Sequence, residues 1–307
     1  MRKTLTLDNG KLHVEVIPEL GSKLSSLRLS GGAELLQQPL RPYAARTREM
    51  AFDESDASGF DECLPSVSGC VVQTAAGAVT IPDHGDFWRI EWQGEQSGDE
   101  IRLRADGFSL PLRFEKTLRL EDSSVILAYR VTNLSDQPVE YAWSAHPLFT
   151  VDAGDRILLP GTVESVVVQG SAGDRLGTAG TRHNWPRAIQ SDGKTVDLSI
   201  AGDIADGIGD KLYTAAPAEG WCAIERRKEK CRISVHFDVT EIPSLGLWLC
   251  YGGWPEKGTA RQQCVALEPC TAPVDSLAQA MENGSAKRLT AGQSDTWQIT
   301  VRLTGVS

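Results

Sequence analysis

The sequence predicts an all-β protein, a β-sandwich built as one domain over residues 1–307 with at most a few short helices. Three observations support this prediction. Short segments that alternate polar and apolar side chains, the pattern of a half-buried strand, recur along the whole chain, about twenty in all. Gly, Pro and Asn residues separate these segments as turn signals. Only one segment, near residue 280, has a helical pattern.

The first predicted element is a hairpin, because Asp8-Asn9-Gly10 is a tight-turn signal between two alternating segments, and a third segment ends at Gly31-Gly32. Residues 37–68 lack a clear period, and irregular stretches of this length often carry function. Near the C-terminus, Asp275 can cap a short helix that Gly284 ends. The other predicted strands are 70–74, 78–82, 88–92, 100–105, 112–120, 124–134, 156–159, 164–169, 195–200, 210–215, 221–226, 231–239, 245–251, 263–269 and 296–303.

Charge and composition limit the possible partners. The formal net charge is -10, and the one basic run, Arg226-Arg227-Lys228, is flanked by Glu225 and Glu229. We therefore expect no nucleic-acid partner and no anionic membrane surface. No apolar run is long enough to span a bilayer, so no membrane partner is expected. A neutral small molecule suits this charge.

Cysteine usage indicates the compartment. The seven cysteines are an odd number and form no CxxC pair, and the N-terminal residues contain no secretory pattern. Reduced core thiols are therefore expected, rather than disulfides or a zinc site, and the compartment expected is the cytoplasm. The interpretation requires no metal.

The first candidate for chemistry is His146. Residues 139–146 alternate as a strand, and Ala142 and Ser144, on the face of His146, are small. Pro147 lacks a backbone donor, so ladder pairing should stop just after the histidine. A titratable ring at a strand end with open volume beside it suits a pocket, although a hydrogen-bonded core histidine is the alternative.

Glu268 repeats this arrangement on a distant strand. Cys264 and Ala266 precede it on the same face, and Pro269 follows it. The histidine and the glutamate could converge as an acid/base pair. The alternative for Glu268 alone is a salt-bridged strand end.

A second histidine lies in a predicted loop. His84 precedes Gly85, and Trp88 and Trp92 follow shortly after. Glycine allows the backbone to approach a ligand closely, so His84 is a candidate binding residue. The alternative is a turn histidine bonded to nearby backbone.

Together these motifs resemble the aldose 1-epimerase (galactose mutarotase-like) family. The resemblance rests on His84-Gly85 with a following tryptophan, then AHPLF at 145–149, LEP at 267–269, APVDSL at 272–277 and LTAGQS at 289–294, in that order over nearly the whole chain. The family fold is a β-supersandwich, which agrees with the all-β prediction. The resemblance implies interconversion of the α and β anomers of a sugar by ring opening, without a cofactor.

The resemblance also implies residue roles. Glu268 would be the general base, His146 the general acid and His84 a partner for sugar hydroxyls. Burial could raise the pKa of the glutamate and a nearby carboxylate could raise the pKa of the histidine. Asp210 best matches the expected sugar-binding carboxylate, with a turn residue as its alternative. Trp254, after two glycines, is a candidate to pack on a sugar face.

One departure from the family pattern concerns the substrate. Members commonly carry an Asn-Arg pair ahead of the HG motif, but residues 59–65 read GFDECLP and contain no arginine. Asp61 and Glu62 could accept hydrogen bonds from ligand hydroxyls instead, or belong to a solvated loop. A sugar phosphate is disfavoured, because it would be expected to recruit arginine or lysine.

The sequence therefore predicts an aldose 1-epimerase acting on an unphosphorylated sugar, as a monomer or homodimer. Two alternatives stay open on the same fold: a non-catalytic carbohydrate-binding protein, and a lyase or hydrolase acting on an oligosaccharide. Asp61 or Glu62 facing Glu268 would favour the hydrolase.

Overall fold

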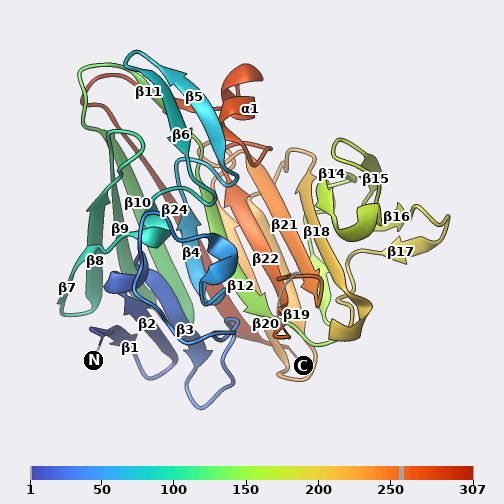
Figure 1. Cartoon of the computed structure of the whole chain (residues 1–307). Helices are drawn as coiled ribbons and strands as arrows, with labels where there is room; N and C mark the ends of the chain where they lie inside the picture. Colours follow the sequence, from blue (N-terminus) through green and yellow to red (C-terminus); the bar gives the residue numbers. More distant parts are fainter. Residues whose placement is uncertain (1, 256–258, 307) are drawn as a thin grey trace.

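The protein is described by a computed structural model that covers residues 2–255 and 259–306. Two large antiparallel sheets contain most of its strands (Figure 1). In spatial order, the ten-stranded sheet consists of β1 (Leu5–Asp8), β2 (Leu12–Ile17), β3 (Lys23–Leu29), β4 (Phe60–Cys63), β12 (Ser144–Thr150), β22 (Gln263–Cys270), β21 (Ser244–Tyr251), β18 (Ile208–Thr214), β14 (Ser165–Ser171) and β15 (Arg182–Asn184).

The second sheet has eight strands and packs against the first. In spatial order it consists of β13 (Arg156–Leu158), β19 (Trp221–Arg226), β20 (Cys231–Phe237), β24 (Ser294–Gly305), β10 (Ser124–Asn133), β9 (Leu112–Glu121), β8 (Glu100–Asp106) and β7 (Gln93–Ser97). One apolar core joins the two sheets, with Leu27 and Leu247 from the first and Phe114, Leu127 and Val235 from the second. The predicted all-β sandwich is confirmed.

Small elements complete the chain. Three two-stranded sheets pair β5 (Cys70–Thr74) with β6 (Gly77–Ile81), β11 (Val139–Tyr141) with β23 (Lys287–Leu289), and β16 (Arg187–Ile189) with β17 (Thr195–Asp197). The α-helix α1 (Leu277–Glu282) is short, and the 3-10 turns are η1 (Pro18–Leu20), η2 (Phe52–Glu54), η3 (Phe87–Arg89), η4 (Ala172–Asp174) and η5 (Ile204–Asp206). Within the described ranges, no helix is long and apolar enough to cross a membrane.

The predicted N-terminal hairpin is present as β1 and β2, joined at Gly10, whose φ of 80° suits glycine. The predicted cap of the C-terminal helix was wrong. Ser276 is the N-cap, since its side chain accepts a hydrogen bond from the backbone N–H of Gln279. Asp275 points its carboxylate elsewhere, toward Tyr213 and Lys211.

The strands of the two candidate catalytic residues are neighbours. In the ten-stranded sheet, β12 lies between β4 and β22, so segments far apart in the sequence meet at its centre. Strand pairing was predicted to stop just after His146, but β12 continues through Pro147. Likewise β22 continues through Pro269. Pro147 pairs with Phe60 and Pro269 with Leu245, each inside a strand. The β12–β22 ladder is instead interrupted between Ser144↔Cys270 and Leu148↔Ala266, where the two prolines leave backbone donors missing.

Candidate functional site

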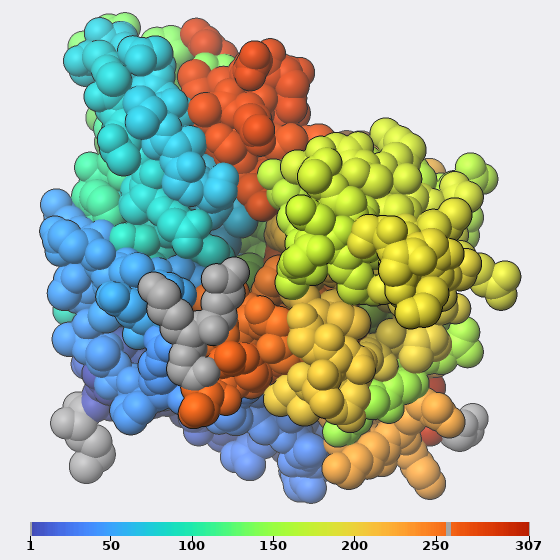
Figure 2. Space-filling view, turned by 45° about the vertical axis from the view of Figure 1, so that its right-hand side comes forward, coloured from blue at the N-terminus to red at the C-terminus, as the bar shows by residue number. Residues whose placement is uncertain are grey.

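A cavity of about 280 Å³ opens beside β12, β18, β21 and β22. In Figure 2 the N-terminal segments, blue to cyan, and the C-terminal segments, orange to red, meet around a hollow on this face. The cavity is at the small end of the range for ligand pockets and suits one small molecule. Its lining residues are Ala51, Phe52, Asp53, Val67, Ser68, Asp83, His84, His146, Lys211, Trp248, Trp254, Gln262, Glu268 and Asp275.

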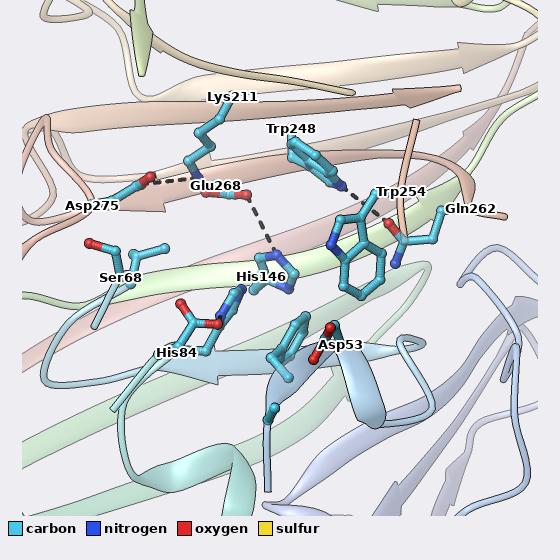
Figure 3. Close-up of a pocket in the computed structure, with 14 residues that line it drawn as sticks. Asp53, Ser68, His84, His146, Lys211, Trp248, Trp254, Gln262, Glu268 and Asp275 are labelled. Atoms are coloured by element: carbon cyan, nitrogen blue, oxygen red, sulfur yellow. Dashed lines mark hydrogen bonds and ion pairs between the residues drawn. The ribbon is translucent and has the colours of Figure 1, made fainter. Parts of the chain in front are cut away.

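His146 and Glu268 face each other within this lining (Figure 3). The register on both sides of the ladder interruption places the two residues opposite each other on β12 and β22, so their side chains share a face of the sheet. His146 Nε2 lies 3.9 Å from Glu268 Oε1. Glu268 Oε1 and His146 Nδ1 are buried and have no hydrogen-bond partner among the residues that the structure describes. The structure therefore brings together the predicted acid/base pair and leaves one oxygen and one nitrogen of it unpaired.

Lys211 holds the other oxygen of Glu268. Its Nζ forms an ion pair with Glu268 Oε2 and lies 3.7 Å from Asp275 Oδ1. Asp275 Oδ1 also accepts a hydrogen bond of 2.7 Å from the Tyr213 hydroxyl. Gly246 is the register partner of both Tyr213 and Glu268, and a Cβ there would lie 3.0 Å from Glu268 Oε2. A glycine at this position leaves the room in which the lysine and the glutamate meet.

His84 enters the cavity from the loop after β6. Its backbone is left-handed, with φ of 58°, and a Cβ on the next residue, Gly85, would lie 2.0 Å from Leu64 O, so this turn requires glycine. Asp83 Oδ2 lies 2.9 Å from His84 Nδ1, which orients the ring. Phe52 stacks on the imidazole with ring centroids 3.7 Å apart. The His84 and His146 rings meet edge to face at 5.2 Å.

One wall of the cavity is aromatic. Trp254 lies 6.0 Å from Phe52 between ring centroids, and Trp248 lines the same space. Gln262 accepts a hydrogen bond of 3.2 Å from Trp248 Nε1, which fixes the indole. Lys211 and Glu268 lie beside Trp248 in the same lining (Figure 3). Aromatic rings next to polar groups suit a ligand with C–H faces and hydroxyl edges.

Burial shifts both members of the pair toward their neutral forms. It raises the pKa of Glu268, an effect that the charge of Lys211 opposes. Burial, with smaller contributions from the charges of His84 and Lys211, holds the pKa of His146 well below its usual value. The expectation that a nearby carboxylate raises the pKa of this histidine was wrong, because burial dominates. His146 is therefore a neutral imidazole in the free protein.

Three predicted binding residues do not line the cavity. Asp210 is buried, forms an ion pair with Arg175 and accepts a hydrogen bond of 2.6 Å from Ser171. Successive side chains of a strand point to opposite faces, so the neighbour of Asp210 on β18, Lys211, is the one that reaches the cavity.

Asp61 and Glu62 also lie elsewhere. Asp61 forms a buried ion pair with Lys23, and Glu62 is 3.4 Å from Lys116 Nζ inside the sandwich. Glu62 points into the sandwich. Asp61 is the register partner of His146 and pairs through one oxygen with Lys23, but it does not line the cavity. Of the predicted residues, the structure gathers His84, His146, Trp254 and Glu268 at the cavity.

Sequence reasoning missed Lys211, Asp275 and Phe52. For Lys211 the sequence shows only that it alternates with Tyr213 on one strand face; that this face borders the cavity depends on β21, where Trp248 is its register partner. Phe52 lies in the irregular stretch 37–68, which was expected to be functional, but nothing in its local pattern marks it. Among the described residues there is no group of three or more His, Cys, Asp or Glu that could hold a metal ion.

Comparison with solved structures of other proteins identifies the fold. No protein-family model matches the sequence, and no curated protein does. A putative aldose 1-epimerase from Escherichia coli K12 has a similar structure, with a TM-score of 0.74, 17% identity and 100% of both chains covered. A galactose mutarotase-like protein from Clostridium acetobutylicum has a TM-score of 0.70 at 14% identity, covering 99% of this chain and 96% of that one.

The Slr1438 protein from Synechocystis sp. PCC 6803 is similar too, with a TM-score of 0.72, 16% identity, and 99% and 96% of the two chains covered. At these identities the comparisons establish the fold. The predicted galactose mutarotase-like β-supersandwich is confirmed.

Proposed function

We propose that this protein is an aldose 1-epimerase that interconverts the α and β anomers of a free, unphosphorylated sugar. The observation that carries the proposal is the unpartnered Glu268 Oε1 facing His146 Nε2 at 3.9 Å in the cavity wall. The fold shared with a putative aldose 1-epimerase supports it.

The reaction moves one proton within the sugar. Glu268 removes the proton of the anomeric hydroxyl, the ring oxygen gains a proton, and the bond from C1 to the ring oxygen breaks to give the open aldehyde. Rotation about C1–C2 followed by the reverse steps gives the other anomer. Burial favours the protonated form of Glu268, so the carboxylate takes up this proton readily.

His146 supplies the proton for the ring oxygen. Because its imidazole is neutral, one ring nitrogen carries a proton and the other can accept one. The ring donates its N–H to the ring oxygen while its other nitrogen accepts the proton that Glu268 has taken. Neither residue is left with an additional charge, which suits a buried pair. His84, oriented by Asp83, lies beside this ring to bind a hydroxyl group.

The charges of the cavity favour an uncharged sugar. Four lining residues are acidic, Asp53, Asp83, Glu268 and Asp275, whereas Lys211 is the one lysine or arginine among the described lining residues. Lys211 is already paired with two of these carboxylates. A phosphate or a sugar acid would meet repulsion without a free lysine or arginine among the described lining residues to compensate.

Polarimetry on freshly dissolved aldoses tests the proposal. The wild-type protein should accelerate the approach to anomeric equilibrium for at least one free aldose, and the phosphate ester of the same sugar should react more slowly. Rates equal to buffer across a broad panel would overturn the proposal; saturable sugar binding without acceleration would favour the carbohydrate-binding alternative. The hydrolase alternative called for Asp61 or Glu62 facing Glu268. Both are paired with lysines and neither lines the cavity, although Asp61 shares the sheet face of its register partner His146.

A further inference from the structure

We propose that Lys211 is a positioning residue for Glu268: it fixes one carboxylate oxygen, turns the other toward His146, and places a positive charge beside the buried base. This role of Lys211 goes beyond the acid/base pair. Its kinetic test rests on the proposed function, whereas a titration of Glu268 tests the role independently.

The two oxygens of the Glu268 carboxylate have different surroundings. Lys211 Nζ pairs with Oε2, whereas Oε1 has no hydrogen-bond partner within the described part of the chain and lies 3.9 Å from His146 Nε2. A carboxylate free to rotate could present either oxygen, whereas one clamped by a charge-assisted hydrogen bond presents a single oxygen. Lys211 therefore selects which oxygen acts as the base.

The lysine itself is held in place. Its side chain is 12% exposed, and Asp275 Oδ1 lies 3.7 Å from Nζ on the side away from the histidines (Figure 3). Tyr213 fixes Asp275 through its hydroxyl and places its ring 5.3 Å from Nζ. Since Gly246 has no side chain, the lysine crosses β21 from β18 to reach Glu268 on β22.

Several titratable groups surround Glu268, including the Tyr213 hydroxyl and the thiols of Cys63, Cys264 and Cys270, whose pKa values burial raises. His146 faces it from β12, His84 from the loop after β6, Lys211 from β18 and Asp275 from the segment after β22. Among these, Lys211 has the largest effect in lowering the pKa of Glu268, against the burial that raises it, whereas Asp275 raises it. Burial also disfavours the charge of Lys211, but Glu268 and Asp275 outweigh it and raise the pKa of the lysine, which stays charged.

The kinetic test compares pH profiles of mutarotation. A base that must be ionised loses activity as the pH falls through its pKa, which gives the kcat/KM profile an acid limb. Removing the lysine charge raises the pKa of Glu268, so this limb moves to higher pH. We expect Lys211→Met and the neutral, polar Lys211→Gln to move the limb upward by about one pH unit or more. Lys211→Arg should keep it near the wild-type position, and Asp275→Asn should move it in the opposite direction.

Lys194→Met is the matched control, because Lys194 is 77% exposed and pairs only with Asp192 in the described ion pairs. It should leave both rate and profile unchanged. A merely structural lysine would lower the amount of folded protein without moving the limb. An acid limb that stays at the wild-type pH in folded Lys211→Met and Lys211→Gln would overturn the inference.

A direct titration separates this inference from the proposed function. The carboxyl carbon of Glu268 is followed by NMR in protein labelled with ¹³C-glutamate and assigned with Glu268→Gln. Its midpoint should rise in Lys211→Gln and remain at the wild-type value in Lys194→Met. If wild-type protein accelerates no sugar, the epimerase proposal fails while this titration still decides the role of Lys211. If the protein is active and the midpoint does not move, only the role of Lys211 fails.

Discussion

Two glutamate–lysine pairs, on opposite faces of the ten-stranded sheet, show how the same chemistry serves different purposes. Glu62 on β4 is the register partner of Ala145, so it points into the sandwich, and Glu268 on β22 lies opposite the next residue, His146, so it points to the cavity. Both glutamates are fully buried. The two glutamates differ in how many of their carboxylate oxygens accept hydrogen bonds.

In the inner pair every carboxylate oxygen is occupied. Glu62 Oε1 accepts hydrogen bonds from Tyr129 at 2.9 Å and Lys116 at 3.4 Å, and Oε2 accepts one from Trp143 Nε1 at 3.0 Å. In the cavity pair, Glu268 Oε1 accepts no hydrogen bond from any described residue. A saturated carboxylate stabilises the core, whereas a half-saturated one beside a cavity is available for proton transfer.

The largest expected effect is on activity at the cavity pair. Glu268→Gln removes the base but keeps the shape, so kcat should fall by about 10²–10⁴-fold. Asp275 remains beside Lys211, so the free energy of unfolding should change less than in a variant of the inner pair. Steady-state polarimetry and urea unfolding on the same preparations measure both. Retention of wild-type kcat would remove Glu268 from the mechanism.

Breaking the inner pair should affect stability instead. Lys116→Met leaves Glu62 as a buried carboxylate with no cation from the described residues within ion-pair distance, which costs about 3–5 kcal/mol. Urea unfolding should show the loss, while activity per folded molecule stays close to wild type. Lys194→Met is the control for loss of a lysine charge at the surface. A Lys116→Met protein as stable as this control would show that the inner pair does not stabilise the core.

The third expected effect is a pH dependence of stability that arises in a buried cluster of Lys23, Arg46, Asp56 and Asp61. Burial raises the pKa of Asp56, but the charges of Lys23 and Arg46 outweigh it and lower that pKa from 3.8 to about 2. The unfolded chain therefore binds more protons in this interval, so the stabilisation is complete above pH 3.8 and is lost as the pH falls to about 2. It amounts to about 2.5 kcal/mol.

Chemical unfolding at several pH values between 2 and 6 tests this expectation. Asp56→Asn should remove this part of the pH dependence, and Asp192→Asn, at an exposed surface pair, should leave most of it. Parallel pH profiles for the wild type and Asp56→Asn would contradict the assignment.

The smallest expected effect concerns the aromatic wall. Trp254→Ala removes a surface on which the C–H face of a sugar can pack, so KM should rise by about tenfold with a smaller change in kcat. Trp254→Phe should recover part of the loss. Initial rates over a range of sugar concentrations separate the two constants. An unchanged KM in the alanine variant would place the sugar away from this wall.

Part of this arrangement was accessible from the sequence. Alternation predicted the strands and placed His146 and Glu268 on faces with small neighbours, and register then brought them together. The pairing of Asp61 and Glu62 was not accessible, because Lys23 and Lys116 lie far away in the sequence and no local pattern links them. Three-residue strands such as β15, β16 and β23 are too short to show a period, so they were not predicted.

The choice between Asp210 and Lys211 shows most clearly what the sequence could not predict about the site. Adjacent residues on a strand face opposite ways, and the sequence does not say which face of β18 borders the cavity. That depends on the neighbouring β21 strand, where Trp248 pairs with Lys211. Packing against distant strands therefore determined the site.

The most direct test of the central claim is exchange NMR on a ¹³C1-labelled aldose with equal concentrations of folded wild type, Glu268→Gln and Lys116→Met. Wild type and Lys116→Met should both exchange α and β anomer signals faster than buffer, and Glu268→Gln should fall close to the buffer rate. Exchange by Glu268→Gln at the wild-type rate would show that the cavity pair does not catalyse the reaction.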